Sequence, residues 1–214
     1  MAVCGITDES NDADPGKDGW FFGGFFAFHT LLYGKTTNQA WITGTDPAIL
    51  VKEYTRYLHG NPHSTRKVVM DTFRLKKMDK DAFMVVKPNR VNTTFKSTIT
   101  SACSAARKDK SPVLILIFGH GSVNGDVALG EELNRDDKNI FSIADMTGRI
   151  RVELGVQATI LSSACFNGLW TCDVSLNVTS MSCWLQATDE GDQHVKVETR
   201  TVLQYVVLLS LIHI

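Results

Sequence analysis

The sequence feature that most constrains the fold is the continuous apolar run Val113–Phe118, which Pro112 precedes and Gly119 follows. A run of this length without alternating polar residues is typical of a strand that is buried on both faces of a parallel sheet. Proline is tolerated just before such a strand, where no hydrogen bond of the ladder is lost. The run therefore predicts a central strand whose sheet is covered by helices on both faces.

The rest of the chain alternates between short apolar runs and helical patterns, which is typical of an α/β fold with a mostly parallel central sheet flanked by helices. Further strands are expected at residues 2–6, 39–43, 67–71, 82–86, 156–162 and 184–188. Helices are expected at residues 20–33, 46–60, 92–106 and 143–150.

The second of these helices has the clearest boundaries in the sequence. Asp46 is an expected N-cap, Pro47 suits the first helical position, and Gly60 is expected to close the helix. The apolar stripe of this helix would then include Tyr57 and Leu58.

The overall composition excludes several classes of protein. The chain has 214 residues, and 22 Lys and Arg against 23 Asp and Glu give a net charge of −1. No segment is basic enough to predict nucleic-acid binding. Hydrophobic residues make up 43% and charged residues 21%, which is the composition of a globular domain and not of a disordered chain. One domain is expected at this length.

The cysteines indicate a reducing environment. There are five of them, an odd number at irregular spacing, and a chain of this size needs no disulfide framework to fold. Residues 1–10 lack the cationic and apolar regions of a secretory signal. We therefore expect a cytoplasmic protein. Cys103 shares a helical face with Phe95 and Ile99, which predicts a small core residue.

The C-terminal segment 202–214 is the longest apolar stretch, but Gln204, Ser210 and His213 interrupt it, so no membrane span is expected. Residues 209–214 resemble the translation of a transposon-end adapter used in sequencing libraries. We expect a single domain over residues 1–208 that is truncated at its C-terminus, followed by a non-native tail at residues 209–214.

Two of the predicted strands end in reactive residues. His120 follows the run Val113–Phe118, and Cys165 follows the strand at residues 156–162. Ligands of parallel sheets bind beyond the carboxyl ends of the strands, and the small residues Gly121 and Ala164 would let a substrate backbone approach there. A thiol, an imidazole and main-chain N–H groups are the groups that acyl transfer requires.

The segments around these two residues resemble the motifs of the caspase-like cysteine peptidases, a superfamily that includes caspases, metacaspases and legumains. Residues 118–122, FGHGS, are similar to the His-Gly segment of legumains and metacaspases. Residues 164–168, ACFNG, resemble their Ala/Asp-Cys-x-Ser-Gly motif, and the Cys-to-Gly interval is one residue longer than in caspases. The resemblance covers the strand and helix order over residues 2–188.

The resemblance implies a three-layer caspase-like fold and a cysteine endopeptidase that acts on polypeptides. No cofactor is expected, and no metal site is expected because the intervals between Cys165, Cys172 and Cys183 match no common zinc spacing. A need for calcium stays open.

The resemblance also implies that Cys165 is the nucleophile, that His120 is the general acid and base, and that the N–H groups of Gly121 and Cys165 bind the oxyanion. In legumains a third, orienting residue comes from the loop after the first strand, and Asn11 is the nearest candidate.

The preferred substrate side chain stays open at this stage. Asp189, Glu190 and Asp192 would favour a basic residue if they rim the pocket, but they also fit a solvated loop. Caspase-like pockets for aspartate use arginines, and Arg200 is the only arginine after Cys165.

Two alternatives to a hydrolase also stay open. An amine can intercept the acyl-enzyme in place of water, which would make the protein a transpeptidase or transamidase. An inactive caspase-like scaffold that binds partners is the alternative outside the enzymes, although such a scaffold has no need of both His120 and Cys165. The oligomeric state has no sequence signal.

Overall fold

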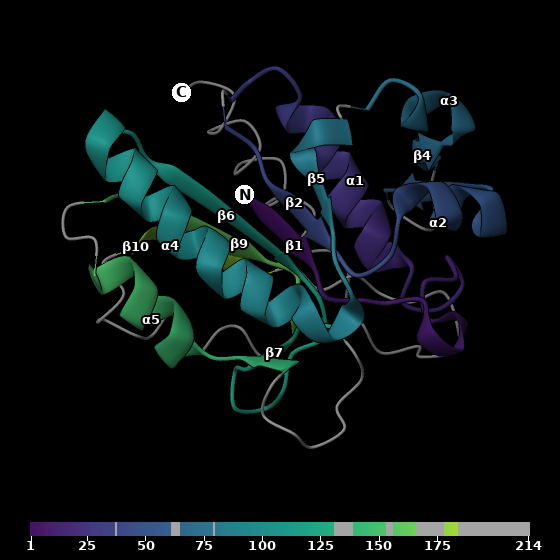
Figure 1. Ribbon diagram of the computed structural model, residues 1–214. Coiled ribbons are helices and arrows are strands. Elements are labelled where there is room, and N and C mark those ends of the chain that lie inside the picture. Colours follow the sequence, from purple (N-terminus) through teal and green to yellow (C-terminus); the bar gives the residue numbers. More distant parts are fainter. Residues whose placement is uncertain are drawn as a thin grey trace.

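The computed structural model describes residues 1–36, 38–60, 65–78, 80–130, 139–152, 156–165 and 178–183 (Figure 1). Its main sheet has six parallel strands in the order β10-β9-β6-β1-β2-β5. These strands are β1 (Ala2–Cys4), β2 (Trp41–Thr43), β5 (Phe83–Val85), β6 (Val113–Phe118), β9 (Ala158–Ser162) and β10 (Val178–Cys183).

The strand order creates a switch point in the middle of the sheet. From β1 the chain adds β2 and then β5 toward one edge, whereas β6, β9 and β10 extend the sheet toward the other edge. Connections therefore leave the carboxyl ends of β1 and β6 in opposite directions. In open parallel sheets this is the place where a ligand crevice forms.

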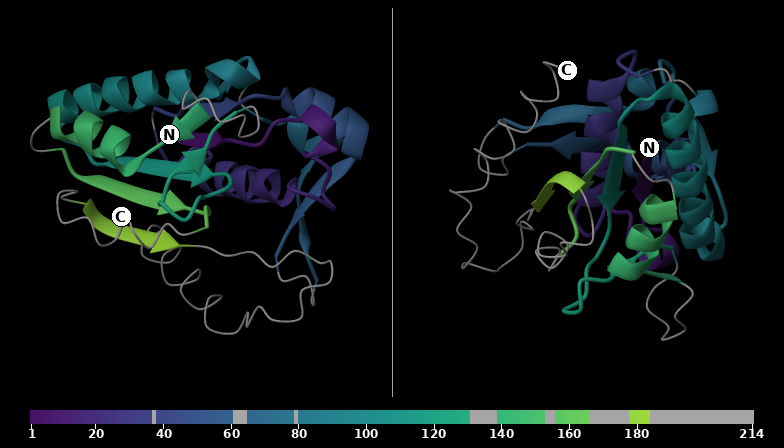
Figure 2. Two further views of the ribbon diagram at one scale, coloured as in Figure 1. Left: turned by 90° about the horizontal axis from the view of Figure 1, so that it is seen from below. Right: turned by 90° about the vertical axis from the view of Figure 1, so that its left-hand side faces the viewer.

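Helices pack on both faces of the sheet, as Figure 2 shows. The helices are α1 (Trp20–Leu32), α2 (Pro47–Tyr54), α3 (Thr72–Leu75), α4 (Val91–Asp109) and α5 (Ile143–Val152). Two antiparallel hairpins, β3 (Arg56–His59) with β4 (Lys67–Asp71) and β7 (Val127–Ala128) with β8 (Ile140–Phe141), stand apart from the sheet. Short 3₁₀ helices lie at η1 (Glu9–Asn11), η2 (Lys80–Ala82) and η3 (Pro88–Arg90).

Strand β6 divides the hydrophobic core in two. Ile115 and Ile117 pack with α4 and α5 on one face, and Leu116 and Phe118 pack with α1 on the other. Alternate side chains of a strand point to opposite faces, so an uninterrupted apolar run supplies both cores at once. All four of these side chains are buried, which confirms the prediction of a central parallel strand.

Most elements expected from the sequence are present. Cys103 is a residue of α4 and its side chain is fully buried in the core, as its helical spacing predicts. A capping box begins α5: Asp145 N donates to Ser142 Oγ at 3.1 Å, and Ser142 N donates to Asp145 Oδ2 at 3.2 Å. The strand expected at residues 184–188 lies outside the described residues.

One expectation is wrong. The helix expected at residues 46–60 ends at Tyr54, and Thr55 takes a positive φ of 68° at its C-cap. The following residues form β3, which pairs with β4. Tyr57 is buried there and its hydroxyl donates to Ala13 O at 2.8 Å, a tertiary contact that helical spacing could not reveal.

The glycines of α1 allow close packing against its neighbours. A Cβ at Gly23 would lie 2.7 Å from Leu58 O, and a Cβ at Gly24 would lie 3.1 Å from the Phe118 ring. We expect Gly23→Ala to lower the free energy of unfolding by about 1–3 kcal/mol because the helix must move away from β3. Gly148→Ala is the matched control, since nothing lies within 4 Å of that position in α5. It should stabilise the protein by up to about 1 kcal/mol. Urea unfolding measures both, and equal effects would contradict the close packing.

Candidate functional site

The candidate site lies at the carboxyl ends of β6 and β9, which are neighbours in the sheet. Residues 119–121 leave β6, and residues 163–165 leave β9. The two segments touch: a Cβ at Gly121 would overlap the carbonyl oxygen of Cys165 and would lie 2.9 Å from its backbone nitrogen. The structure therefore places the backbone of Cys165 in contact with Gly121, the residue that follows His120.

A carboxylate and an aromatic ring hold the imidazole of His120. Its Nε2 lies 2.8 Å from Asp18 Oδ2, and its side chain is 47% exposed. The Phe21 ring meets it edge to face, with centroids 4.9 Å apart and an interplanar angle of 78°. A carboxylate on one ring nitrogen orients a histidine ring and fixes its tautomer.

The loop between β1 and α1 positions Asp18 through a turn around Asp14. Lys17 N and Gly19 N both donate to Asp14 O, at 2.8 and 2.9 Å, and Gly16 N donates to Asp14 Oδ1 at 2.7 Å. A Cβ at Gly19 would overlap the carbonyl oxygen of Ala13, so the turn requires glycine at this position. Asp18 lies at the end of this turn, two residues before α1 begins at Trp20.

Asp18 is a site residue that the sequence analysis missed. The expected orienting residue, Asn11, lies exposed in η1 on the same loop, with a φ of 59°. An aspartate just before an apolar helix is ordinarily taken as a helix-capping residue, so only its contact with His120 distinguishes it.

Cys165 differs from the buried cysteines of the described chain. Cys4 and Cys103 are fully buried, whereas Cys165 is partly exposed. Burial raises the pKa of the Cys4 thiol far above its usual range, which disfavours the nucleophilic thiolate. Cys165 is therefore more accessible to a reactant than Cys4 or Cys103.

Main-chain hydrogen bonds fix the two strand ends. Ser163 N donates to Ile117 O at 2.9 Å and so extends the β6–β9 ladder past the end of β9. Ala128 N donates to His120 O at 2.9 Å, which ties the His120 backbone to β7. Rigid elements of this kind hold reacting groups more accurately than free loops do.

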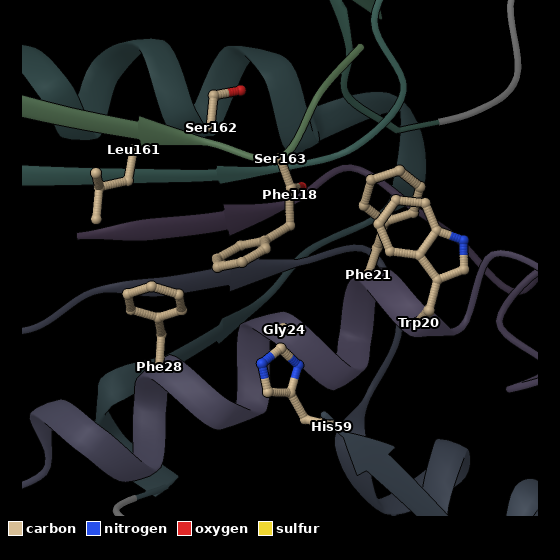
Figure 3. Close-up of a pocket in the computed structure, with 9 residues that line it drawn as sticks. All are labelled: Trp20, Phe21, Gly24, Phe28, His59, Phe118, Leu161, Ser162 and Ser163. Atoms are coloured by element: carbon tan, nitrogen blue, oxygen red, sulfur yellow. The ribbon is translucent and has the colours of Figure 1, made fainter. Parts of the chain in front are cut away.

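Two cavities border Trp20, the first residue of α1. The first, here called the aromatic cavity, lies between α1 and the ends of β6 and β9; Trp20, Phe28, Phe118, His59 and Ser163 contribute to its lining (Figure 3). Its free volume of about 20 Å³ holds about one water molecule. Burial lowers the pKa of His59, which favours a neutral imidazole on this apolar wall.

The second cavity, here called the arginine cavity, lies between the β1–α1 loop and the β3–β4 hairpin. Its volume is about 380 Å³, and its lining includes Asp14, Trp20, Arg56, Tyr57 and Arg66. It is larger and more polar than the aromatic cavity, and Trp20 borders both of them.

Several residues weighed in the sequence analysis lie outside the described residues. They include the acidic residues Asp189, Glu190 and Asp192, together with Arg200. Among the described residues there is no group of three or more His, Cys, Asp or Glu side chains that could hold a metal ion. In the same part of the chain, no helix is both long enough and apolar enough to cross a membrane.

Comparisons with protein-family models, with curated proteins and with solved structures found no match to this chain. The function is therefore inferred from the chemistry of the site.

Proposed function

We propose that this protein is a cysteine endopeptidase with a three-layer caspase-like fold, in which Cys165 and His120 cleave the peptide bond. The observation that carries the proposal is the contact between Cys165 and Gly121, which places the thiol-bearing residue beside a histidine held by Asp18. Both reactive residues leave neighbouring parallel strands at the carboxyl edge, where α/β proteins bind their ligands.

The chemistry proceeds through an acyl-enzyme. Cys165 Sγ attacks the carbonyl carbon of the peptide bond, and its proton passes to the imidazole of His120. The imidazole returns the proton to the leaving amine as the C–N bond breaks. Water, which gives a proton to His120, then attacks the thioester, and the thiol regains that proton. Asp18 keeps the ring oriented throughout.

The oxyanion of both tetrahedral intermediates needs preorganised donors. Gly121 and Cys165 meet through their backbones, so their N–H groups are the nearest main-chain candidates. Removing one such donor in a hydrolase typically costs about 10²–10³ in kcat.

Covalent labelling tests the proposal directly. An acyloxymethyl-ketone library that varies the side chain next to the reactive carbonyl should label the protein once, and peptide mass spectrometry should find the label on Cys165. The buried thiols of Cys4 and Cys103 serve as internal controls. A label on Cys103, or no label from any member of the library, would count against the proposal.

Asp18 is expected to act as a positioning residue. Asp18→Asn should lower kcat at least about tenfold while KM changes little, because a misoriented imidazole loses part of the roughly 10²–10⁴-fold supplied by a positioned acid or base. Asp18→Glu should recover part of that loss. The control is Asp12→Asn in the same loop, which should leave kcat unchanged. Steady-state kinetics measures both constants, and a change confined to KM would contradict the positioning role.

A further inference from the structure

The helices α2 and α3 present two large apolar side chains to solvent. Ile49 of α2 is 55% exposed, and Phe73 of α3 is 65% exposed. The two helices contact each other and the β3–β4 hairpin, and they lie outside the central sheet (Figure 1). Neither side chain lines the aromatic cavity or the arginine cavity. Single apolar side chains are common on protein surfaces, so the meaning of this pair depends on the groups around it.

The exposure of these two side chains does not come from poor packing of the helices. Leu50 and Val51 anchor α2 because both are buried in the core. Leu75 anchors α3 because it packs against the same core cluster. Both helices therefore have a defined inner face, and Ile49 and Phe73 belong to the outer one.

Lysines flank both apolar side chains. Lys52 follows Ile49 by three positions, which places the two residues on one face of α2. Lys76 and Lys77 follow Phe73 by three and four positions, and Lys77 Nζ lies 4.1 Å from the centre of the Phe73 ring. All three lysines are exposed. The outer surface of these helices thus combines apolar side chains with cations.

The positive charge of this region is not neutralised locally. Lys52, Arg74, Lys76 and Lys77 form no ion pair with any residue that the structure describes. In residues 46–78, seven Lys and Arg stand against three Asp and Glu, which gives a net charge of +4. The whole chain carries −1, so the remainder carries −5. The charge of the chain is therefore asymmetric, and its positive part carries the exposed apolar pair.

An anionic lipid surface is complementary to both properties. Negative headgroups attract lysines and arginines near the membrane, and apolar side chains enter the boundary between headgroups and acyl chains. Lysine stems lie along apolar surface while their ammonium groups reach the headgroups. A bilayer receives projecting side chains without a shaped pocket, which a protein partner would have to supply. Nucleic-acid phosphates would account for the lysines but not for Ile49 and Phe73.

We propose that the α2–α3 surface, which consists of Ile49, Lys52, Phe73, Lys76 and Lys77, docks the protein reversibly on anionic membranes. None of these residues belongs to the candidate catalytic site, so docking and cleavage are separate properties. The inference goes beyond the proposed peptidase function and does not depend on it. Docking would concentrate the protein beside polypeptides on the same membrane.

Vesicle sedimentation with the full chain tests the proposal. Vesicles of phosphatidylcholine and phosphatidylserine should bind the wild-type protein at least about tenfold more tightly than vesicles of phosphatidylcholine alone, because several cations meet the anionic surface together. Raising the salt concentration from about 0.1 M to about 1 M shortens the Debye length from about 10 Å to about 3 Å, and should remove most of this preference.

Two variants separate the electrostatic and the apolar contributions. Lys76→Gln combined with Lys77→Gln should weaken binding to the anionic vesicles at least about tenfold. Phe73→Ala should weaken it at least about fivefold, because the ring no longer leaves water for the lipid boundary. All three side chains are exposed, so circular dichroism should show an unchanged fold.

Matched controls carry the same changes at other places on the surface. Lys108→Gln combined with Lys110→Gln removes two exposed cations at the end of α4, and Val123→Ala truncates an apolar side chain that is 70% exposed in the segment between β6 and β7. Neither control should change the binding to anionic vesicles.

Three results would overturn the proposal, and none of them bears on peptide cleavage. The first is equal binding to both kinds of vesicle, or equal losses in the test and control variants. The second is binding that the lysine changes abolish but that Phe73→Ala leaves intact, which would indicate a general anion contact such as an acidic protein makes. The third is binding that resists salt and survives every variant, which would assign it to another segment such as the apolar residues 202–214.

Discussion

Replacement of Cys165 by alanine should abolish both peptide cleavage and covalent labelling while the fold remains intact. The change removes one partly exposed sulfur at a strand end, where the backbone is held by the β6–β9 ladder and not by the side chain. Residual activity should fall below detection, since Cys4 and Cys103 are both buried and cannot replace Cys165 as the nucleophile. Peptide turnover and circular dichroism of the same preparation measure the two outcomes.

Cys103→Ala provides the matched control for this change. Turnover should stay within a few-fold of the wild type, and the free energy of unfolding should fall by about 1 kcal/mol or more through lost packing. If well-folded Cys103→Ala lost activity a hundredfold, the nucleophile would have to be reassigned, although its burial under α4 argues against that. If Cys165→Ala kept substantial activity, the peptidase proposal would fail and an interaction scaffold would replace it.

His120→Ala has the second largest expected effect. Loss of the imidazole should lower turnover about a hundredfold or more, the range for a positioned acid and base. Slow alkylation of Cys165 by an acyloxymethyl ketone should persist, because the thiol is still present. Single-turnover labelling rates, compared with peptide cleavage rates, separate these two effects.

The double variant of His120 and Cys165 tests whether the pair acts as a unit. Groups that act in one step show strongly non-additive losses, so the double variant should be no worse than Cys165→Ala alone. The matched control for His120 is His29→Ala, a buried histidine of α1 outside the candidate site. It should impair stability more than it impairs turnover per folded molecule. Equal losses of turnover in the two histidine variants would contradict the role of His120.

Much of the sheet could be predicted from the sequence because its strands carry their own local signal. The run Val113–Phe118 is apolar throughout since both of its faces are buried, and the neighbouring parallel strand β9 is also mostly buried, although Thr159 and Ser162 interrupt its apolar residues. Once two such strands are neighbours, the residues that follow them must share one edge of the sheet. The placement of His120 near Cys165 thus follows from local patterns and from the geometry of parallel sheets.

The other contacts of the site could not be predicted in this way. Tyr57 has the spacing of a helical stripe, yet it belongs to β3. Its hydroxyl donates a buried hydrogen bond to Ala13 O, which belongs to a loop far from Tyr57 in the chain. Arg56 and Arg66 face Asp14 only after the hairpin has packed beside that loop. Their exposed or half-exposed positions leave no periodic pattern in the sequence.

The amino-acid sequence by itself therefore determined the parallel sheet, the buried strands and the two reactive residues at their ends, because burial leaves a periodic apolar pattern along the chain. Only the tertiary structure decided that the residue beside His120 is Asp18 and not Asn11. The distance from Asp18 Oδ2 to His120 Nε2 is 2.8 Å. It also decided that two arginines and Trp20 line one cavity. The physical reason is that polar contacts between distant segments depend on how those segments pack, and packing is a property of the whole chain.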